Sequence, residues 1–214
     1  MNGLFAPDSA LMRVLTRIAD LMILNALFLV TSLPIVTIGA SLTALNFVAL
    51  RIAGDRDESI VADYFRSFRL NLRQATGIAA LLALLSVVLL AWYVVVTQMI
   101  DSAGARFVLL AAWYVVVFAF AMSTLYVFPY LATFEGGTRE VLRNARRMSM
   151  RHPLAPLAAI VLIILAALVT IFEPKAVGYG LLWLLIGVSG IAYLSGLLYS
   201  RVFARYARAD PLPV

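Results

Sequence analysis

Five long stretches without a charged side chain dominate this sequence. They cover residues 21–50, 74–100, 107–134, 153–172 and 176–200. A helix needs about 20 apolar residues to cross the hydrocarbon core of a bilayer, which is roughly 30 Å thick. Because 64% of the 214 residues are hydrophobic and only 13% are charged, a water-soluble fold of this size could not bury its apolar surface. The pattern predicts an all-α, polytopic transmembrane helix bundle.

The first stretch is too long for one simple crossing. Residues 21–50 would extend about 45 Å as a single helix. They contain Pro34 and Gly39, which are candidate helix breaks because proline lacks a backbone donor and disfavours helix at the preceding residue. Such a break can hold a binding site, but a simple hairpin turn or close packing through small residues is favoured. Two alternatives remain, one long kinked helix (five helices in all) or a hairpin near Pro34 (six helices).

The distribution of Lys and Arg favours the hairpin. With six helices, 15 of these residues lie on the cytoplasmic side and 2 outside, against 13 and 4 for a single kinked helix. Basic residues concentrate in cytoplasmic loops, so we expect six helices in one membrane domain, with both termini cytoplasmic. The helices are expected at about residues 11–33, 35–53, 75–100, 107–134, 153–172 and 176–204.

Two segments combine a basic face with an apolar stripe at helical spacing. We expect residues 60–74 and 138–151 to form amphipathic interfacial helices on the cytoplasmic side. Their arginines are candidates for a surface that faces lipid or a partner protein: Arg66, Arg69, Arg73, Arg143, Arg146, Arg147 and Arg151. Anionic lipid is the favoured contact, and the alternative is docking like the coupling helix of an ABC permease. The segments also align at an offset of 77 residues, which is consistent with an internal repeat.

The residues that catalysis would need are scarce. The chain has no cysteine and a single histidine, His152, and it lacks the motifs of zinc peptidases, serine hydrolases and P-loop enzymes. We therefore predict no enzyme activity and no catalytic, metal-binding or cofactor-binding residues. No ionisable group lies well inside an apolar stretch, which disfavours ion-coupled transport. The net charge of +6 is explained by cytoplasmic basic loops, and no nucleic-acid partner is expected.

Three stretches of the chain resemble the YesL-like family of bacterial integral membrane proteins. They read LFAPDS, SLPIVTIGASLTAL and YFRSFRLNLRQAT; the resemblance extends over the whole chain and is densest from Met1 to about Thr76. The resemblance implies a location in the bacterial plasma membrane and an association with carbohydrate uptake systems, beside which members are commonly encoded. It transfers no functional residues, because the family has no agreed site.

These observations favour a non-catalytic accessory or assembly component of a carbohydrate (ABC-type) uptake system. Its expected partners are the lipid bilayer and the permease or other membrane subunits of such a system. A stand-alone carrier or channel for a small neutral solute is the main alternative. A regulatory protein at the membrane surface is the second alternative. The solute, the partner and the oligomeric state do not follow from the sequence.

Overall fold

The computed structural model describes residues 10–55, 59–175 and 177–207, and all secondary structure in these ranges is helical. The LFAPDS stretch and residue 176, where the last helix was expected to begin, lie outside them. The elements are α1 (Ala10–Ser32), the 3₁₀ turn η1 (Ile35–Thr37), α2 (Ile38–Ala53), α3 (Ile60–Met99), α4 (Ala103–Thr133), α5 (Thr138–Arg151), α6 (Leu154–Phe172), the 3₁₀ turn η2 (Gly178–Gly180), the π-helical segment η3 (Trp183–Gly187) and α7 (Val188–Ala207).

The predicted all-α membrane fold is confirmed. Six helices in the described ranges are long and apolar enough to cross a bilayer. The first apolar stretch is a hairpin, so the alternative of one kinked helix is wrong. Its turn is stabilised by Thr37, whose hydroxyl donates to the carbonyl oxygens of Thr31 at 2.5 Å and Pro34 at 2.7 Å. The Pro34 carbonyl also accepts from the backbone N–H of Thr37 at 2.9 Å, so Thr37 connects the end of α1 to the turn through both its side chain and its backbone.

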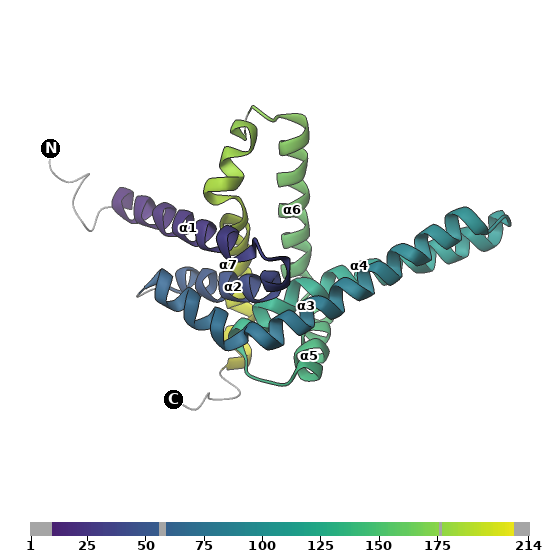
Figure 1. The fold of residues 1–214 in the computed structure, drawn as a ribbon, viewed down its shortest axis with the longest axis horizontal. Helices are drawn as coiled ribbons and strands as arrows, with labels where there is room; N and C mark the ends of the chain where they lie inside the picture. The colour runs from purple at the N-terminus through teal and green to yellow at the C-terminus, as the bar shows by residue number, and fades with distance from the viewer. Residues whose placement is uncertain (1–9, 56–58, 176, 208–214) are drawn as a thin grey trace.

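Gly39 is not a helix break, contrary to the prediction, since it is the second residue of α2. Its role is close packing against α3. A Cβ atom at this position would lie 2.3 Å from the carbonyl oxygen of Ala75 and 2.8 Å from the Cβ of Ala79. Only glycine allows the two backbones to approach this closely. Helix α2 lies at the centre of the molecule, between α1, α3 and α7 (Figure 1).

The interfacial helix expected at residues 60–74 is not separate. These residues form the first part of α3 and continue into the next apolar stretch without interruption. No proline separates the two parts, so the helix propagates. In contrast, α5 ends at Arg151 because Pro153 disfavours helix at His152. The segments that align at an offset of 77 residues therefore join their membrane helices differently, and the repeat stays a prediction.

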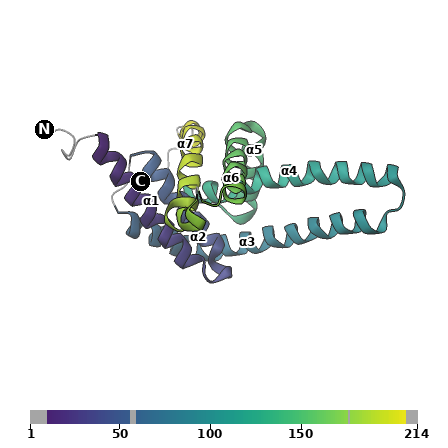
Figure 2. The same cartoon turned by 90° about the horizontal axis from the view of Figure 1, so that it is seen from above.

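Two helical hairpins project from the centre in different directions. Helices α3 and α4 run side by side to a distant tip, while α6 and the chain from η3 to α7 form the second hairpin (Figures 1 and 2). We call the outer part of the first hairpin, residues 79–120, the α3–α4 arm. The indole N–H of Trp113 joins its two helices by donating to the carbonyl oxygen of Leu89 at 2.7 Å.

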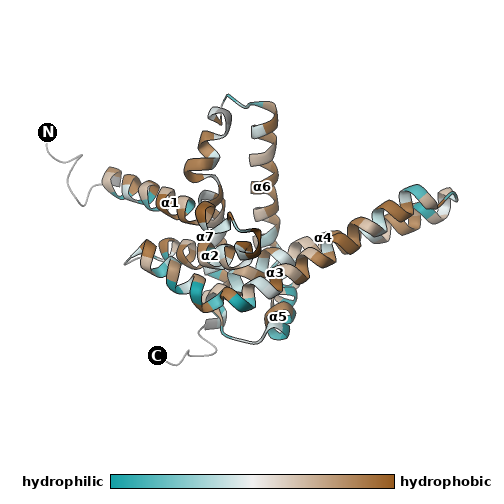
Figure 3. Cartoon of the chain, in the orientation of Figure 1, coloured by the Kyte–Doolittle hydropathy of each residue, from teal (hydrophilic) through white to brown (hydrophobic). Residues whose placement is uncertain are grey.

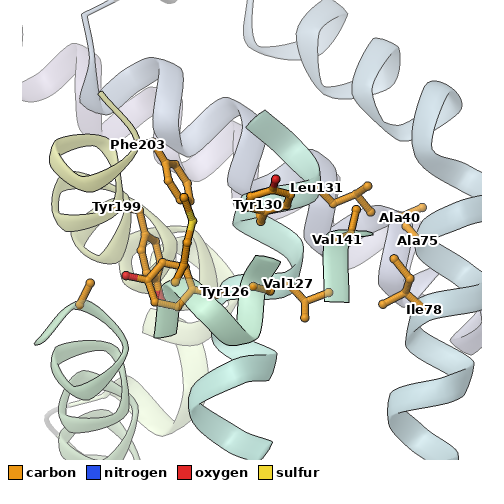
Figure 4. Packing of buried hydrophobic residues seen from close by; sticks show 13 residues of the cluster. Ala40, Ala75, Ile78, Tyr126, Val127, Tyr130, Leu131, Val141, Tyr199 and Phe203 are labelled. Carbon is orange, nitrogen blue, oxygen red and sulfur yellow. The ribbon is translucent and has the colours of Figure 1, made fainter. Parts of the chain in front are cut away.

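Two groups of buried side chains hold the central part together. In the first, Tyr126 of α4 packs against Tyr199 and Phe203 of α7, with ring centres 5.0 Å and 6.3 Å from that of Tyr126 (Figure 4). The second lies among α1, α2, α3 and α7 and includes the fully buried Leu24 and Leu45. Side chains of α2 belong to both groups, so this short helix connects the two halves of the core.

Candidate functional site

The seven arginines proposed from the sequence lie on two separate surfaces. Three are in the first part of α3 and four are in α5, and all seven are exposed. Hydrophilic colours gather on these two segments in Figure 3. In the described ranges, no ion pair joins any of the seven to a carboxylate. Each surface therefore carries positive charge that no carboxylate of the described residues neutralises by direct contact.

A polar pocket of about 510 Å³ adjoins the arginines of α3. It lies between α2, the first part of α3 and the end of α4, and we call it the α2–α3 pocket. Two of its lining residues are joined by a hydrogen bond, in which the side-chain amide of Gln74 donates to the carbonyl oxygen of Gly136 at 2.8 Å. Its polar lining residues include Arg51, Arg66, Ser67, Asn71, Gln74 and Glu135.

The α2–α3 pocket contains both hydrogen-bond donors and acceptors. Arg51 is held in place there by Asp63, with Nε 3.1 Å from Oδ2, and by the ring of Phe47, 5.7 Å from its guanidinium carbon. Ser67 is only 3% exposed, and its hydroxyl has no hydrogen-bond partner among the described residues. A buried hydroxyl without a partner is costly, and a small polar ligand could satisfy it. Of the predicted arginines, Arg66 alone lines this pocket.

A larger groove of about 910 Å³ lies between α3, α4 and α5. Its walls are mostly apolar, and Arg143 and Arg146 of α5 line it. We call it the α5 groove. Two hydrogen bonds fix α5 beside α4: Asn144 donates to the hydroxyl of Tyr130 at 2.9 Å, and Tyr126 donates to the carbonyl oxygen of His152 at 3.1 Å. The sequence indicated the basic face of α5 but not the cavity beside it.

Asn25 is a buried polar residue whose role the sequence analysis missed. Its side-chain amide donates to the carbonyl oxygens of Trp183 at 2.9 Å and Leu184 at 2.8 Å, and its oxygen accepts from the backbone N–H groups of Val188 at 3.1 Å and Ser189 at 3.0 Å. A π-helical segment disturbs the regular backbone hydrogen bonds of an α-helix. The side-chain amide of Asn25 binds four backbone groups in and next to this segment, two carbonyls and two N–H groups. The sequence offered one indication of this role, because Asn25 is a polar amide inside the uncharged stretch 21–50.

A second polar cluster joins α1, α2 and α3 beside the hairpin turn. The hydroxyl of Thr31 lies 2.6 Å from that of Tyr64 and 2.9 Å from that of Ser41. Tyr64 and Ser41 are fully buried. This cluster fixes the start of α3 against the hairpin, so its role is structural.

The described residues do not gather into a metal-binding group of three or more His, Cys, Asp or Glu side chains. His152, the single histidine, lies at the end of α5. Its Nε2 atom is 2.9 Å from the hydroxyl of Tyr206 on α7. This contact joins α5 to the last helix.

Comparisons with known proteins find a match to one family over part of the chain. Residues 21–93 match the family described as "Protein of unknown function, DUF624". The match begins in α1 and ends within α3, so it covers the hairpin, the first part of α3 and part of the α3–α4 arm. No curated protein and no solved structure matches the chain.

Proposed function

We propose that this multi-span membrane protein is a non-catalytic accessory or assembly subunit of a bacterial carbohydrate uptake system. The observation that carries the proposal is the apolar α3–α4 arm. Only 6% of the most apolar window of each of its two helices is buried within the chain. A hairpin that projects from the core with apolar faces can contact lipid on one side and the helices of another membrane subunit on the other.

The outer face of α3 offers a regular contact surface. Val87 and Val88 lie about one helical turn after Leu84, and the three side chains (Leu84, Val87 and Val88) are 60%, 62% and 55% exposed. Association between membrane helices depends on side-chain packing because lipid is as apolar as leucine. The carbohydrate system is chosen on the resemblance of the chain to the YesL-like family, and the match to the DUF624 family over residues 21–93 is compatible with it.

A pull-down of the tagged protein from its native membrane in mild detergent tests the proposal. We expect mass spectrometry to identify a permease subunit of a sugar uptake system. The triple variant Leu84→Ala, Val87→Ala and Val88→Ala should reduce its recovery about ten-fold or more, since hot-spot contacts contribute about 2 kcal/mol or more each. Recovery of the protein without any permease, together with unchanged sugar uptake after gene deletion, would contradict the proposal.

The control is a matched triple variant on α6. Val161, Ile164 and Leu165 have the same spacing and are 61%, 52% and 56% exposed. Replacing them by alanine removes a similar apolar surface from the other hairpin, and we expect recovery of the permease to be unchanged. Equal losses for the two triple variants would mean that the arm has no special role.

The α2–α3 pocket favours a second candidate function, a stand-alone carrier for a small neutral solute. Its buried Ser67 hydroxyl and the side chains of Asn71 and Glu135 could bind the hydroxyl groups of such a solute. Flux of labelled sugar into proteoliposomes that contain only this protein would support the carrier and displace the subunit proposal. Substituting Ser67 by valine should then lower the flux.

A further inference from the structure

The α5 groove is an amphipathic cavity that the proposed function does not use. One part of its lining is mostly apolar, with Ser123 and Thr124 as its polar residues, and belongs to α3 and α4, which are candidate membrane spans. The other part belongs to α5 and carries Arg143 and Arg146. None of the lining residues is Asp or Glu. An occupant must therefore combine a long apolar portion with a negatively charged group.

The position of α5 sets the depth of this charge in the bilayer. The helix connects α4 to α6, two candidate membrane spans, so it lies where these spans leave the hydrocarbon. Its buried residues Val141, Ala145 and Met148 face the core of the protein. Met150, near the end of α5, and Leu154, the first residue of α6, are 71% and 80% exposed. This pattern is typical of a helix at the level of the lipid headgroups.

The apolar part has the length of an acyl chain. On α4 the lining extends from Val115 to Val127, which corresponds to about 18 Å of helix axis at 1.5 Å per residue. On α3 it includes Leu81 and Leu85. The volume of about 910 Å³ is near the upper end of the range of about 300–1,000 Å³ for small-molecule sites.

We propose that the α5 groove binds an anionic phospholipid, with its phosphate between Arg143 and Arg146 and an acyl chain along α3 and α4. The charges of Arg143 and Arg146 favour this occupant over an apolar helix of a partner protein. Such a helix would leave the two guanidinium groups beside apolar surface without a counterion. Arginine pairs with phosphate through two parallel hydrogen bonds. The α3–α4 arm would then be fixed at its base by a lipid. This inference does not depend on the uptake system proposed above.

Native mass spectrometry of the full-length protein in detergent tests the proposal. Two lipids with identical acyl chains are titrated, anionic dioleoylphosphatidylglycerol and zwitterionic dioleoylphosphatidylcholine. We expect the wild type to retain the anionic lipid selectively. The double variant Arg143→Gln and Arg146→Gln should bind it about thirty-fold more weakly, since each basic residue near a lipid surface contributes a factor of about five. Both side chains are exposed, so we expect folding to be unaffected.

Two control variants separate the groove from the surface around it. Arg139→Gln with Arg147→Gln removes the same charge from exposed positions of α5 outside the groove. The loss should be below about five-fold, because these two side chains do not line the groove and salt and water screen their charge from a phosphate inside it. Ala119→Phe places a ring in the apolar part and should weaken binding of both lipids. Ala112→Phe, on the same helix but outside the groove, should leave binding unchanged.

Three results would each overturn the proposal. The first is equal affinity of the wild type for the two lipids. The second is an equal loss for the two arginine pairs, which would indicate general attraction to a basic surface. The third is unchanged binding in the Ala119→Phe variant, which would mean that the acyl chain lies elsewhere.

Discussion

The side-chain oxygen of Asn25 accepts a hydrogen bond of 3.0 Å from the backbone N–H of Ser189, although the two residues are 164 positions apart. Ser189 returns the contact, because its hydroxyl donates to the carbonyl oxygen of Leu21 at 2.7 Å. Both α1 and α7, the first and last membrane helices, therefore contribute polar groups to the contact that joins them. The π-helical segment Trp183–Gly187 directly precedes α7, and its backbone deviates from α-helical pairing. The contact therefore stabilises an irregular backbone in an apolar region.

We expect Asn25→Leu to destabilise the protein by about 2–4 kcal/mol, since the substitution leaves buried backbone groups without partners. Thermal unfolding in mild detergent measures the loss. Asn46→Leu is the control, because the Asn46 amide donates to the carbonyl oxygen of Leu42 on its own helix and joins no second element by that bond. A loss no larger for Asn25→Leu than for Asn46→Leu would contradict the role assigned to Asn25.

Gly39→Ala should also destabilise the fold. The added methyl group would lie within 3 Å of the backbone of Ala75 and the side chain of Ala79, and overpacking of this kind costs about 1–3 kcal/mol. Gly77→Ala is a matched control on α3, since nothing lies within 4 Å of its Cβ position. There we expect a gain of up to about 1 kcal/mol from helix propensity. The same unfolding assay would refute the packing role if the two variants behaved alike.

Local chemistry explains which parts of this fold were predictable. Apolar length predicted the membrane helices. Pro34 predicted a break in the first stretch because proline acts within its own turn of helix, and the distribution of Lys and Arg favoured a hairpin over a kink. The continuity of α3 could have been read from the lack of a breaker near Arg73, whereas the amphipathic pattern suggested a separate helix. The partners of Asn25 and the α5 groove depend on contacts between distant segments. A single sequence does not specify such contacts, so these features required the structure.

The hydrogen bond between Tyr64 and Thr31 supports the junction of the hairpin with α3. We expect Tyr64→Phe to lower the free energy of unfolding by about 1 kcal/mol, because it removes one buried hydroxyl partner and keeps the ring. The ring of Tyr64 packs beside that of Phe68, so its apolar contacts are preserved. Tyr114→Phe, at a side chain that is 61% exposed, should have no measurable effect. Equal behaviour of the two variants in thermal unfolding would contradict the prediction.

The predicted orientation can be tested by cysteine labelling, since the native chain has no cysteine. In intact cells, a membrane-impermeant maleimide should label Ser102→Cys, between α3 and α4. It should label Gly137→Cys, between α4 and α5, only after permeabilisation. These outcomes follow from the positive-inside rule, which predicts that the side of the membrane with the excess of basic residues is cytoplasmic. The reverse pattern would place the arginines of α5 outside the cell and overturn the proposed topology.

The turn between α1 and α2 should behave differently from both of these connections. Leu33, Ile35 and Val36 are 80%, 82% and 70% exposed, and water would solvate this apolar surface poorly. Together with the η1 turn, α2 forms a candidate span of only 19 residues, Ile35–Ala53, about 28 Å at 1.5 Å per residue, which barely covers the hydrocarbon core of roughly 30 Å. We therefore expect the turn to lie inside the bilayer, where the thiolate that reacts with maleimide is disfavoured.

The variant Leu33→Cys should consequently resist the impermeant maleimide both before and after permeabilisation. Unfolding in sodium dodecyl sulfate should make it reactive, which shows that the thiol itself is intact. Ser102→Cys and Gly137→Cys, measured in the same membranes, report that the reagent reaches each side. Labelling of Leu33→Cys in intact cells would mean that the turn reaches the outer water, and α1 and α2 would then each cross the whole bilayer despite the short length of α2.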